Sequence, residues 1–129
     1  MTVALLDTTV LIHLFRKNQA ALSWLVDQEA TFSLTPITWM EVMVGAGNKR
    51  VQAELLRILN NFEVIYLTKD DMDWAMQQML AYRFSHGIGV MDCFNASVAH
   101  RLNIPIYTHN AKDYLKILPA HLVAKPYRE

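Results

Sequence analysis

The chain has 129 residues, enough for one domain with a real core, and its apolar share of 53% exceeds what one small core normally holds. Lysine plus arginine and aspartate plus glutamate number 12 each, which excludes an overall basic field for nucleic acid. With one cysteine and no apolar run of about 18 residues, the sequence predicts no disulfide framework and no membrane span. We expect a single domain over residues 1–129, soluble and cytoplasmic.

The amino-terminal half alternates short apolar segments with helical patterns. Residues 3–6 predict a strand buried on both faces, which turns at Asp7 into a helix. A helical stretch over 20–28 precedes a second strand over 31–34. Thr35 followed by proline is typical of a helix start, and this helix should run to about residue 46.

The carboxyl-terminal half continues the alternation. It predicts a helix over 51–59, a strand over 63–67, and a helix capped by Thr68 or Asp70. The last of these helices carries an apolar stripe at helical spacing, consisting of Met72, Ala75, Met76, Met79 and Leu80. A loop over 86–89, a helix from Asp92 to about residue 102 and a strand over 104–108 follow. The pattern indicates a mostly parallel sheet with helices on both faces, in which ligands bind at the carboxyl ends of the strands.

Four acidic residues fall near those strand ends or early in the helices that follow: Asp7, Glu41, Asp92 and Asp113. Carboxylates brought within a few ångströms of one another repel unless a cation neutralises them. Oxygen ligands from separate elements suit Mg²⁺ or Mn²⁺, which can activate a water against a phosphodiester. Each acid also has a plainer interpretation as a helix cap or a solvent-facing group, and spacing alone leaves both open.

Four segments carry a resemblance to a known family. They are LLDTTVLI, TPITWMEVMVGA, MDCFNASVAHRLNIPIYTHN and, overlapping its end, THNAKDY. They are similar, in this order, to the strand–Asp–x–Ser/Thr/Asn opening, the Thr/Ser–x–x–x–x–Glu–Leu segment, the Asp–x–x–Ile–Ala–Ala helix with its following strand, and the Thr–x–Asn–x–x–Asp/His–Phe motif of PIN domains. The chain resembles most closely the VapC-type ribonuclease toxins of type II toxin–antitoxin pairs.

The resemblance implies a three-layer α/β/α fold and a site around Mg²⁺ or Mn²⁺. Asp7, Glu41, Asp92 and Asp113 would be the catalytic acids, with Asp7 and Asp92 as metal ligands. The resemblance further implies supporting residues around these acids: Thr9, which would orient Asp7 through its hydroxyl, and Thr108 and Asn110, which would shape the floor of the site. Asn95 departs from the family, which usually has an aliphatic residue there, and a supporting role behind the metal ligands is the interpretation that we favour.

The implied activity is magnesium-dependent endonucleolytic cleavage of a structured RNA, such as tRNA or ribosomal RNA, by a metal-activated water. The implied partners are the RNA substrate, a cognate antitoxin and a second copy of the chain in a homodimer. Two alternatives stay open: a PIN nuclease that acts in RNA maturation or DNA processing without an antitoxin, and a catalytically silent binding module.

Overall fold

A five-stranded parallel sheet runs through the centre of the computed structural model, which describes residues 3–128. The strand order is β3-β2-β1-β4-β5, and each neighbouring pair is parallel. The strands are β1 (Val3–Leu6), β2 (Thr31–Leu34), β3 (Glu63–Val64), β4 (Ile106–Tyr107) and β5 (Val123–Ala124).

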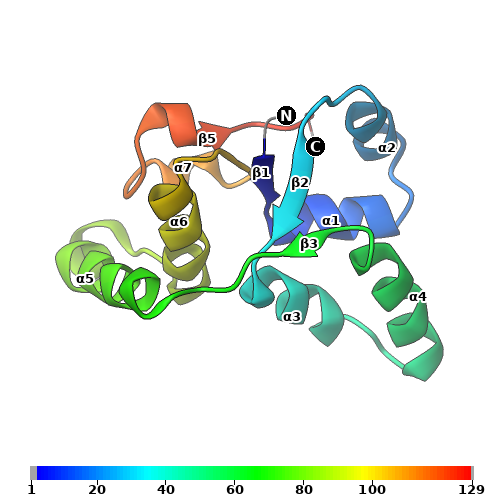
Figure 1. The fold of residues 1–129 in the computed structure, drawn as a ribbon, viewed down its shortest axis with the longest axis horizontal. Coiled ribbons are helices and arrows are strands. Elements are labelled where there is room, and N and C mark those ends of the chain that lie inside the picture. The colour runs from blue at the N-terminus through cyan, green and yellow to red at the C-terminus, as the bar shows by residue number, and fades with distance from the viewer. Residues whose placement is uncertain (1–2, 129) are drawn as a thin grey trace.

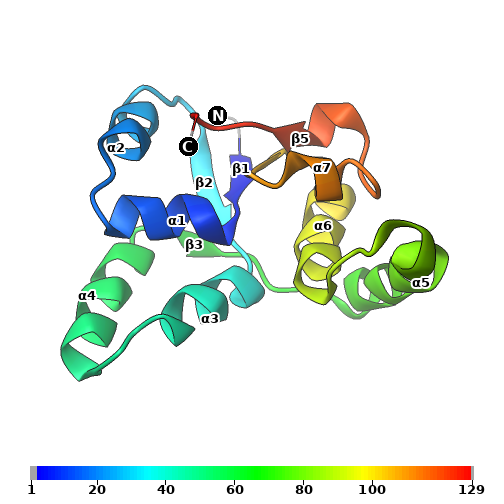
Figure 2. The ribbon, with the colours of Figure 1, turned by 180° about the vertical axis from the view of Figure 1, so that it is seen from behind.

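Helices cover both faces of this sheet and make the predicted three-layer α/β/α architecture (Figures 1 and 2). Both views show α1 to α4 gathered on one side and α5 to α7 on the other. The helices are α1 (Thr8–Phe15), α2 (Gln19–Val26), α3 (Pro36–Val44), α4 (Lys49–Leu59), α5 (Lys69–His86), α6 (Val90–Leu102) and α7 (Ala111–Tyr114), with a short 3₁₀ helix η1 (Ala120–Leu122). Within residues 3–128, no helix has the length and apolar character that crossing a membrane requires.

Strand β1 is the centre of the core because its side chains alternate between the two faces. Ala4 and Leu6 pack into the cluster that contains residues of α1 to α4. Leu5 packs into the second cluster, with residues of α6, α7 and η1. All three are essentially inaccessible to solvent, which confirms the prediction of a strand covered on both faces.

Several helix starts follow the local sequence. Thr35 caps α3 by accepting a hydrogen bond from the Thr38 amide, with Pro36 in the first helical position. Thr68, rather than Asp70, caps α5, where it forms a reciprocal capping box with Asp71.

Several predicted boundaries were wrong. The strand predicted over 63–67 is only Glu63–Val64, and the one predicted over 104–108 is only Ile106–Tyr107. Apolar residues flank both strands, but the sheet pairs only two residues in each. Helix α6 begins at Val90 with Gly89 as its N-cap, so Asp92 lies inside the first turn and does not cap the helix.

An ion pair fixes α6 against α5. The Asp71 carboxylate, buried and already part of the capping box, accepts hydrogen bonds from the Arg101 Nε at 2.9 Å on both of its oxygens. His100, the residue before Arg101, stacks on the Trp74 ring of α5, with ring centroids 4.7 Å apart. These contacts hold the carboxyl-terminal turn of α6, the helix that carries Asp92, against α5.

Candidate active site

Three polar residues lie side by side where the central strands end. Asp7, Thr35 and Thr108 each directly follow a strand, and β1 lies between β2 and β4 in the sheet. The register pairs Leu6 with Tyr107, and the Asp7 amide donates a hydrogen bond to the Tyr107 carbonyl at 3.0 Å. The parallel sheet thus places Asp7 in the middle of a polar row at its carboxyl edge.

The carboxylate of Asp7 is nearly buried and is held by three hydrogen bonds. Its Oδ1 accepts from the Thr8 amide at 2.9 Å and from the Tyr114 hydroxyl at 3.2 Å. Its Oδ2 accepts from the Thr108 hydroxyl at 2.7 Å. The same side chain caps α1, so the capping role and a place in the site are compatible.

Asp92 points toward the same edge from α6. The Asn110 side-chain amide donates to the Asp92 carboxylate at 3.3 Å and to Asp113 at 2.8 Å, so it bridges the two acids. Burial raises the pKa of Asp92 to about 6, and the charge of Asp7 adds to this increase. The nearby Tyr114 hydroxyl opposes the increase, while the charges of Asp113 and Glu41 reinforce it.

Glu41 and Asp113 border the site on either side. The Thr8 hydroxyl donates to Glu41 Oε1 at 2.9 Å, which joins the start of α1 to α3. The hydrogen bond from Asn110 lowers the pKa of Asp113, and Lys116, whose ammonium lies 3.2 Å from the carboxylate, lowers it further. Asp113 is therefore locally neutralised, whereas Asp92 has no cation among the groups that shift its pKa.

The supporting residues expected from the sequence lie in different places. Thr108 and Asn110 contact the acids directly, and the Asn110 amide also donates to the Thr108 hydroxyl at 2.8 Å. Asn95 lies one turn beyond Asp92, fully buried, beneath the acids.

Thr9 does not orient Asp7 through its hydroxyl, as the resemblance implied. In the described chain, the hydroxyls on Asp7 come from Thr108 and Tyr114, and Thr9 makes no hydrogen bond to this carboxylate. The reason is geometric: Asp7 takes its helical donor from the Thr8 amide, and its remaining contacts come from across the sheet.

Tyr114 is the site residue that the sequence reasoning missed. It is completely buried, and its hydroxyl contacts Asp7 although the two residues are 107 positions apart. The available signal was the last letter of THNAKDY, because the motif that this segment resembles has phenylalanine at that position.

The donor chemistry fits a hard divalent cation. The converging groups are carboxylates, and neighbouring carboxylates contribute to the raised pKa of Asp92. No three His, Cys, Asp or Glu side chains in residues 3–128 lie close enough together to enclose a metal ion. Mg²⁺ does not require such a cage, because it commonly keeps several waters and binds one or two carboxylates. Two carboxylates such as those of Asp7 and Asp92 would meet this requirement.

Comparison with known families identifies the fold. The family model described as PIN domain matches residues 4–117, most of the chain. The chain belongs to the PIN domain family. No curated protein sequence matches it significantly.

Solved structures place this PIN domain among VapC-type toxins in fold. A toxin–antitoxin complex from Klebsiella pneumoniae contains a chain with 28% identity and a TM-score of 0.78, covering 98% of this chain and 99% of that one. VapBC2 from Rickettsia felis, bound to a promoter DNA fragment, matches at 19% identity and TM-score 0.77, covering 98% and 100%. Mycobacterium tuberculosis VapC20, a sarcin–ricin loop cleaving toxin, matches at 13% identity and TM-score 0.72, covering 89% and 95%.

The raised pKa of Asp92 predicts that ionisation of this side chain lowers the stability of the metal-free folded protein. The folded-state pKa of Asp92, about 6, exceeds the ordinary value of 3.8. The contribution of Asp92 to stability is therefore fully present below pH 3.8 and is lost as the pH rises through about 6. Asp92→Asn should therefore raise the free energy of unfolding at about pH 7.5 by on the order of 1 kcal/mol, allowing for solvent screening. The gain should vanish near pH 4.

Urea unfolding in EDTA at both pH values measures this difference. Asp27→Asn, at the exposed end of α2, is the matched control and should change stability little at either pH. A gain of the same size at both pH values would contradict the electrostatic explanation.

Proposed function

We propose that this PIN domain is a Mg²⁺- or Mn²⁺-dependent endoribonuclease and the toxin of a type II toxin–antitoxin pair. The observation that carries the proposal is the convergence of four acids from different parts of the fold. Asn110 bridges Asp92 of α6 and Asp113 of α7. The Thr8 hydroxyl joins Glu41 of α3 to the start of α1, which Asp7 caps. A cluster of acids at the ligand-binding edge of a parallel sheet is costly without a cation. Membership of the PIN family supports the same conclusion from independent information.

Asp7 and Asp92 would hold the cation, and the remaining side chains would orient them. When bound, the ion activates a water and neutralises charge on the scissile phosphate. Thr108 and the Thr8 amide fix the two oxygens of Asp7, and Asn110 fixes Asp92 relative to Asp113. Glu41, held by the Thr8 hydroxyl, faces the site from α3 and can accept a proton or orient a water.

The resemblances support a proposal for the substrate and the partner. A chain of the Klebsiella pneumoniae toxin–antitoxin complex and the sarcin–ricin loop cleaving toxin share this fold over most of their lengths. We therefore propose a structured RNA cut in an accessible single-stranded loop, and a small antitoxin that blocks the site. Such a toxin would act in the cytoplasm, where its RNA is found.

Asp7→Asn tests the enzymatic proposal. Asparagine keeps the shape of the side chain and caps a helix about as well, so α1 should remain intact. Loss of the negative charge should reduce RNA cleavage by ~100-fold or more, because the metal loses a strong ligand. The measurement is single-turnover cleavage of total RNA with Mg²⁺, with Mn²⁺ and with EDTA.

Asp70→Asn is the matched control, since Asp70 is exposed in the first turn of α5 and should leave cleavage unchanged. An Asp7→Asn protein that cleaves at the parental rate would place the reaction elsewhere. A parent without divalent-dependent cleavage of RNA would favour the silent binding module, and one that cuts only DNA would favour a processing nuclease.

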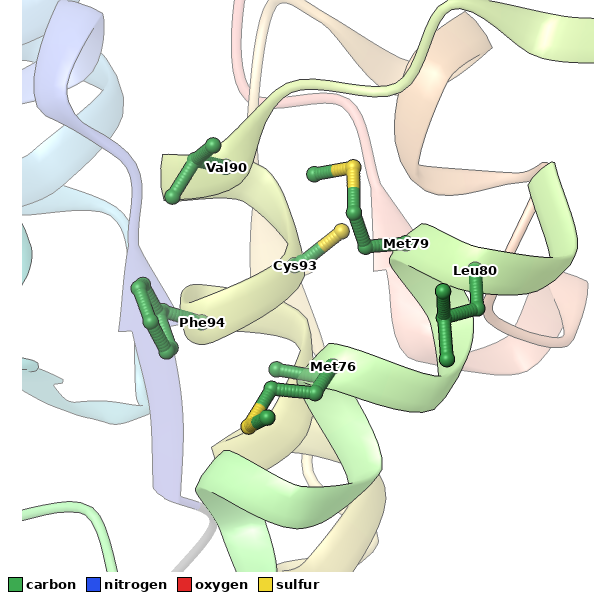
Figure 3. Close-up of a pocket in the computed structure, with 7 residues that line it drawn as sticks. Met76, Met79, Leu80, Val90, Cys93 and Phe94 are labelled. Atoms are coloured by element: carbon green, nitrogen blue, oxygen red, sulfur yellow. The ribbon is translucent and has the colours of Figure 1, made fainter. Parts of the chain in front are cut away.

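We also propose that the chain forms a homodimer through the apolar stripe of α5 and Phe84, which lies one turn beyond Leu80 on the same helix. Met76, Leu80 and Phe84 are 62%, 79% and 89% exposed, although the sequence left open that the stripe is ordinary core. Figure 3 shows Met76, Met79 and Leu80 of α5 around a hollow shared with α6. The hollow has a volume of about 300 Å³ and an almost wholly apolar lining, which Val90, Cys93 and Phe94 complete from α6. Monomeric proteins rarely leave so continuous an apolar surface in water, and a second copy would cover it.

Leu80→Lys should convert the dimer to a monomer without unfolding it, because Leu80 is mostly exposed within one chain. Light scattering at high micromolar concentration gives the mass, and circular dichroism checks the fold. Val26→Lys, at an 83% exposed position on α2, is the control and should remain dimeric. A monomeric parent, or a dimeric Leu80→Lys protein, would refute an interface on this surface.

A further inference from the structure

A chain of buried hydrogen bonds runs beneath the acids and ends on Asp7. It begins at the Thr38 amide, which donates to the Thr35 hydroxyl at 3.2 Å. The Thr35 hydroxyl donates to Asn95 Oδ1, and the Asn95 side-chain amide donates to the Tyr114 hydroxyl at 3.4 Å. Tyr114 in turn donates to Asp7 Oδ1 at 3.2 Å.

The direction of these hydrogen bonds is determined from the carboxylate end. An ionised carboxylate only accepts, so the Tyr114 proton points to Asp7 and the hydroxyl oxygen must accept from Asn95. The Asn95 amide nitrogen therefore faces Tyr114 and its oxygen faces Thr35, and because an amide oxygen only accepts, the Thr35 hydroxyl must donate to it. All donors therefore point toward Asp7, and in a dry interior each bond polarises the next.

The side chains that form these hydrogen bonds are almost completely buried, which indicates a specific role for them. Thr35 and Asn95 are each 1% exposed and Tyr114 is 0% exposed. Buried polar groups are costly unless all are paired, and apolar side chains of similar size would fill the same space without that cost. Asn95 and Tyr114 are also two positions at which this sequence has a polar group where the patterns that it resembles have an aliphatic residue and a phenylalanine, respectively. These two departures contact each other.

We propose that Tyr114 is a positioning residue for the metal ligand Asp7 and that Asn95 acts through it. This chain of hydrogen bonds also joins the elements that carry the other acids. Thr35 caps the helix of Glu41. Asn95 follows Asp92 by one turn, and Tyr114 follows Asp113 directly. Tyr114 and Asn95 thereby set the position of Asp7 relative to the other acids. The inference rests on the proposed metal-dependent function and adds two residues to it.

The test measures Mn²⁺ affinity by calorimetry, apart from any activity. Tyr114→Phe removes only the hydroxyl and should weaken Mn²⁺ binding by ~10-fold, the scale of losing a partner that orients a metal ligand. Asn95→Leu should weaken it less. The double variant should match Tyr114→Phe, because Asn95 works through the hydroxyl already removed. In RNA cleavage, kcat should fall with an unchanged KM.

Tyr107→Phe is the matched control, since that ring packs against Trp24 and Phe32 on the other face of the sheet. It should bind Mn²⁺ as the parent does. If Tyr114→Phe folds poorly, the double variant carries the test, because it removes both partners of the bond.

If Tyr114→Phe and the double variant bind Mn²⁺ as tightly as the parent, the inference is wrong and the hydrogen-bond chain only stabilises the fold. A parent that binds Mn²⁺ but does not cleave RNA would refute the proposed function, while the calorimetric comparison would still decide the inference. A parent that does not bind Mn²⁺ would refute both.

Discussion

Repulsion between carboxylates at one edge of the sheet is the constraint on which the site depends. Asp7 ends the central strand, and α3, α6 and α7 bring Glu41, Asp92 and Asp113 toward it. The pKa of Asp92 rises to about 6 because burial and these neighbours all disfavour its charge. Such an arrangement is unfavourable for a protein that only has to fold, and it becomes favourable when a divalent cation lies between the acids.

The fold resists this repulsion with neutral hydrogen-bond donors rather than with lysine or arginine. Thr8, Thr108 and Tyr114 hold Asp7, and Asn110 bridges Asp92 and Asp113. A permanent cation at the centre would cancel the field that attracts a metal ion, whereas a hydroxyl or amide fixes a carboxylate and leaves its charge in place. Of these four acids, Asp113 is the one that forms an ion pair with Lys116 in the described part of the chain.

The sequence predicted those features that depend on local chemistry. The bounds of β1 and β2, the Thr35 cap with Pro36, and the parallel α/β class all follow from short apolar runs and capping residues. Strand β5 was not predicted, because two paired residues carry no alternation that a pattern could reveal.

The contacts within the site were harder to predict than the acids themselves. The approach of Asp7, Glu41, Asp92 and Asp113 follows from the strand-end rule and the motif order. The Thr8 hydroxyl, rather than that of Thr9, forms a hydrogen bond in the site, because the direction of α1 relative to β1 decides which side chain faces Glu41. The contacts of Tyr114 with Asp7 and with Asn95 span 107 and 19 positions, and only the tertiary fold creates them.

The central claim is that Asp7 and Asp92 share one divalent cation at the carboxyl edge of the sheet. Crystals of the parent protein soaked in Mn²⁺ test it directly, because anomalous scattering locates the ion without reference to activity. We predict one strong anomalous peak within coordination distance of carboxylate oxygens of both Asp7 and Asp92, with waters completing the shell. A peak bound only by other residues, or none at millimolar Mn²⁺ near neutral pH, would contradict it.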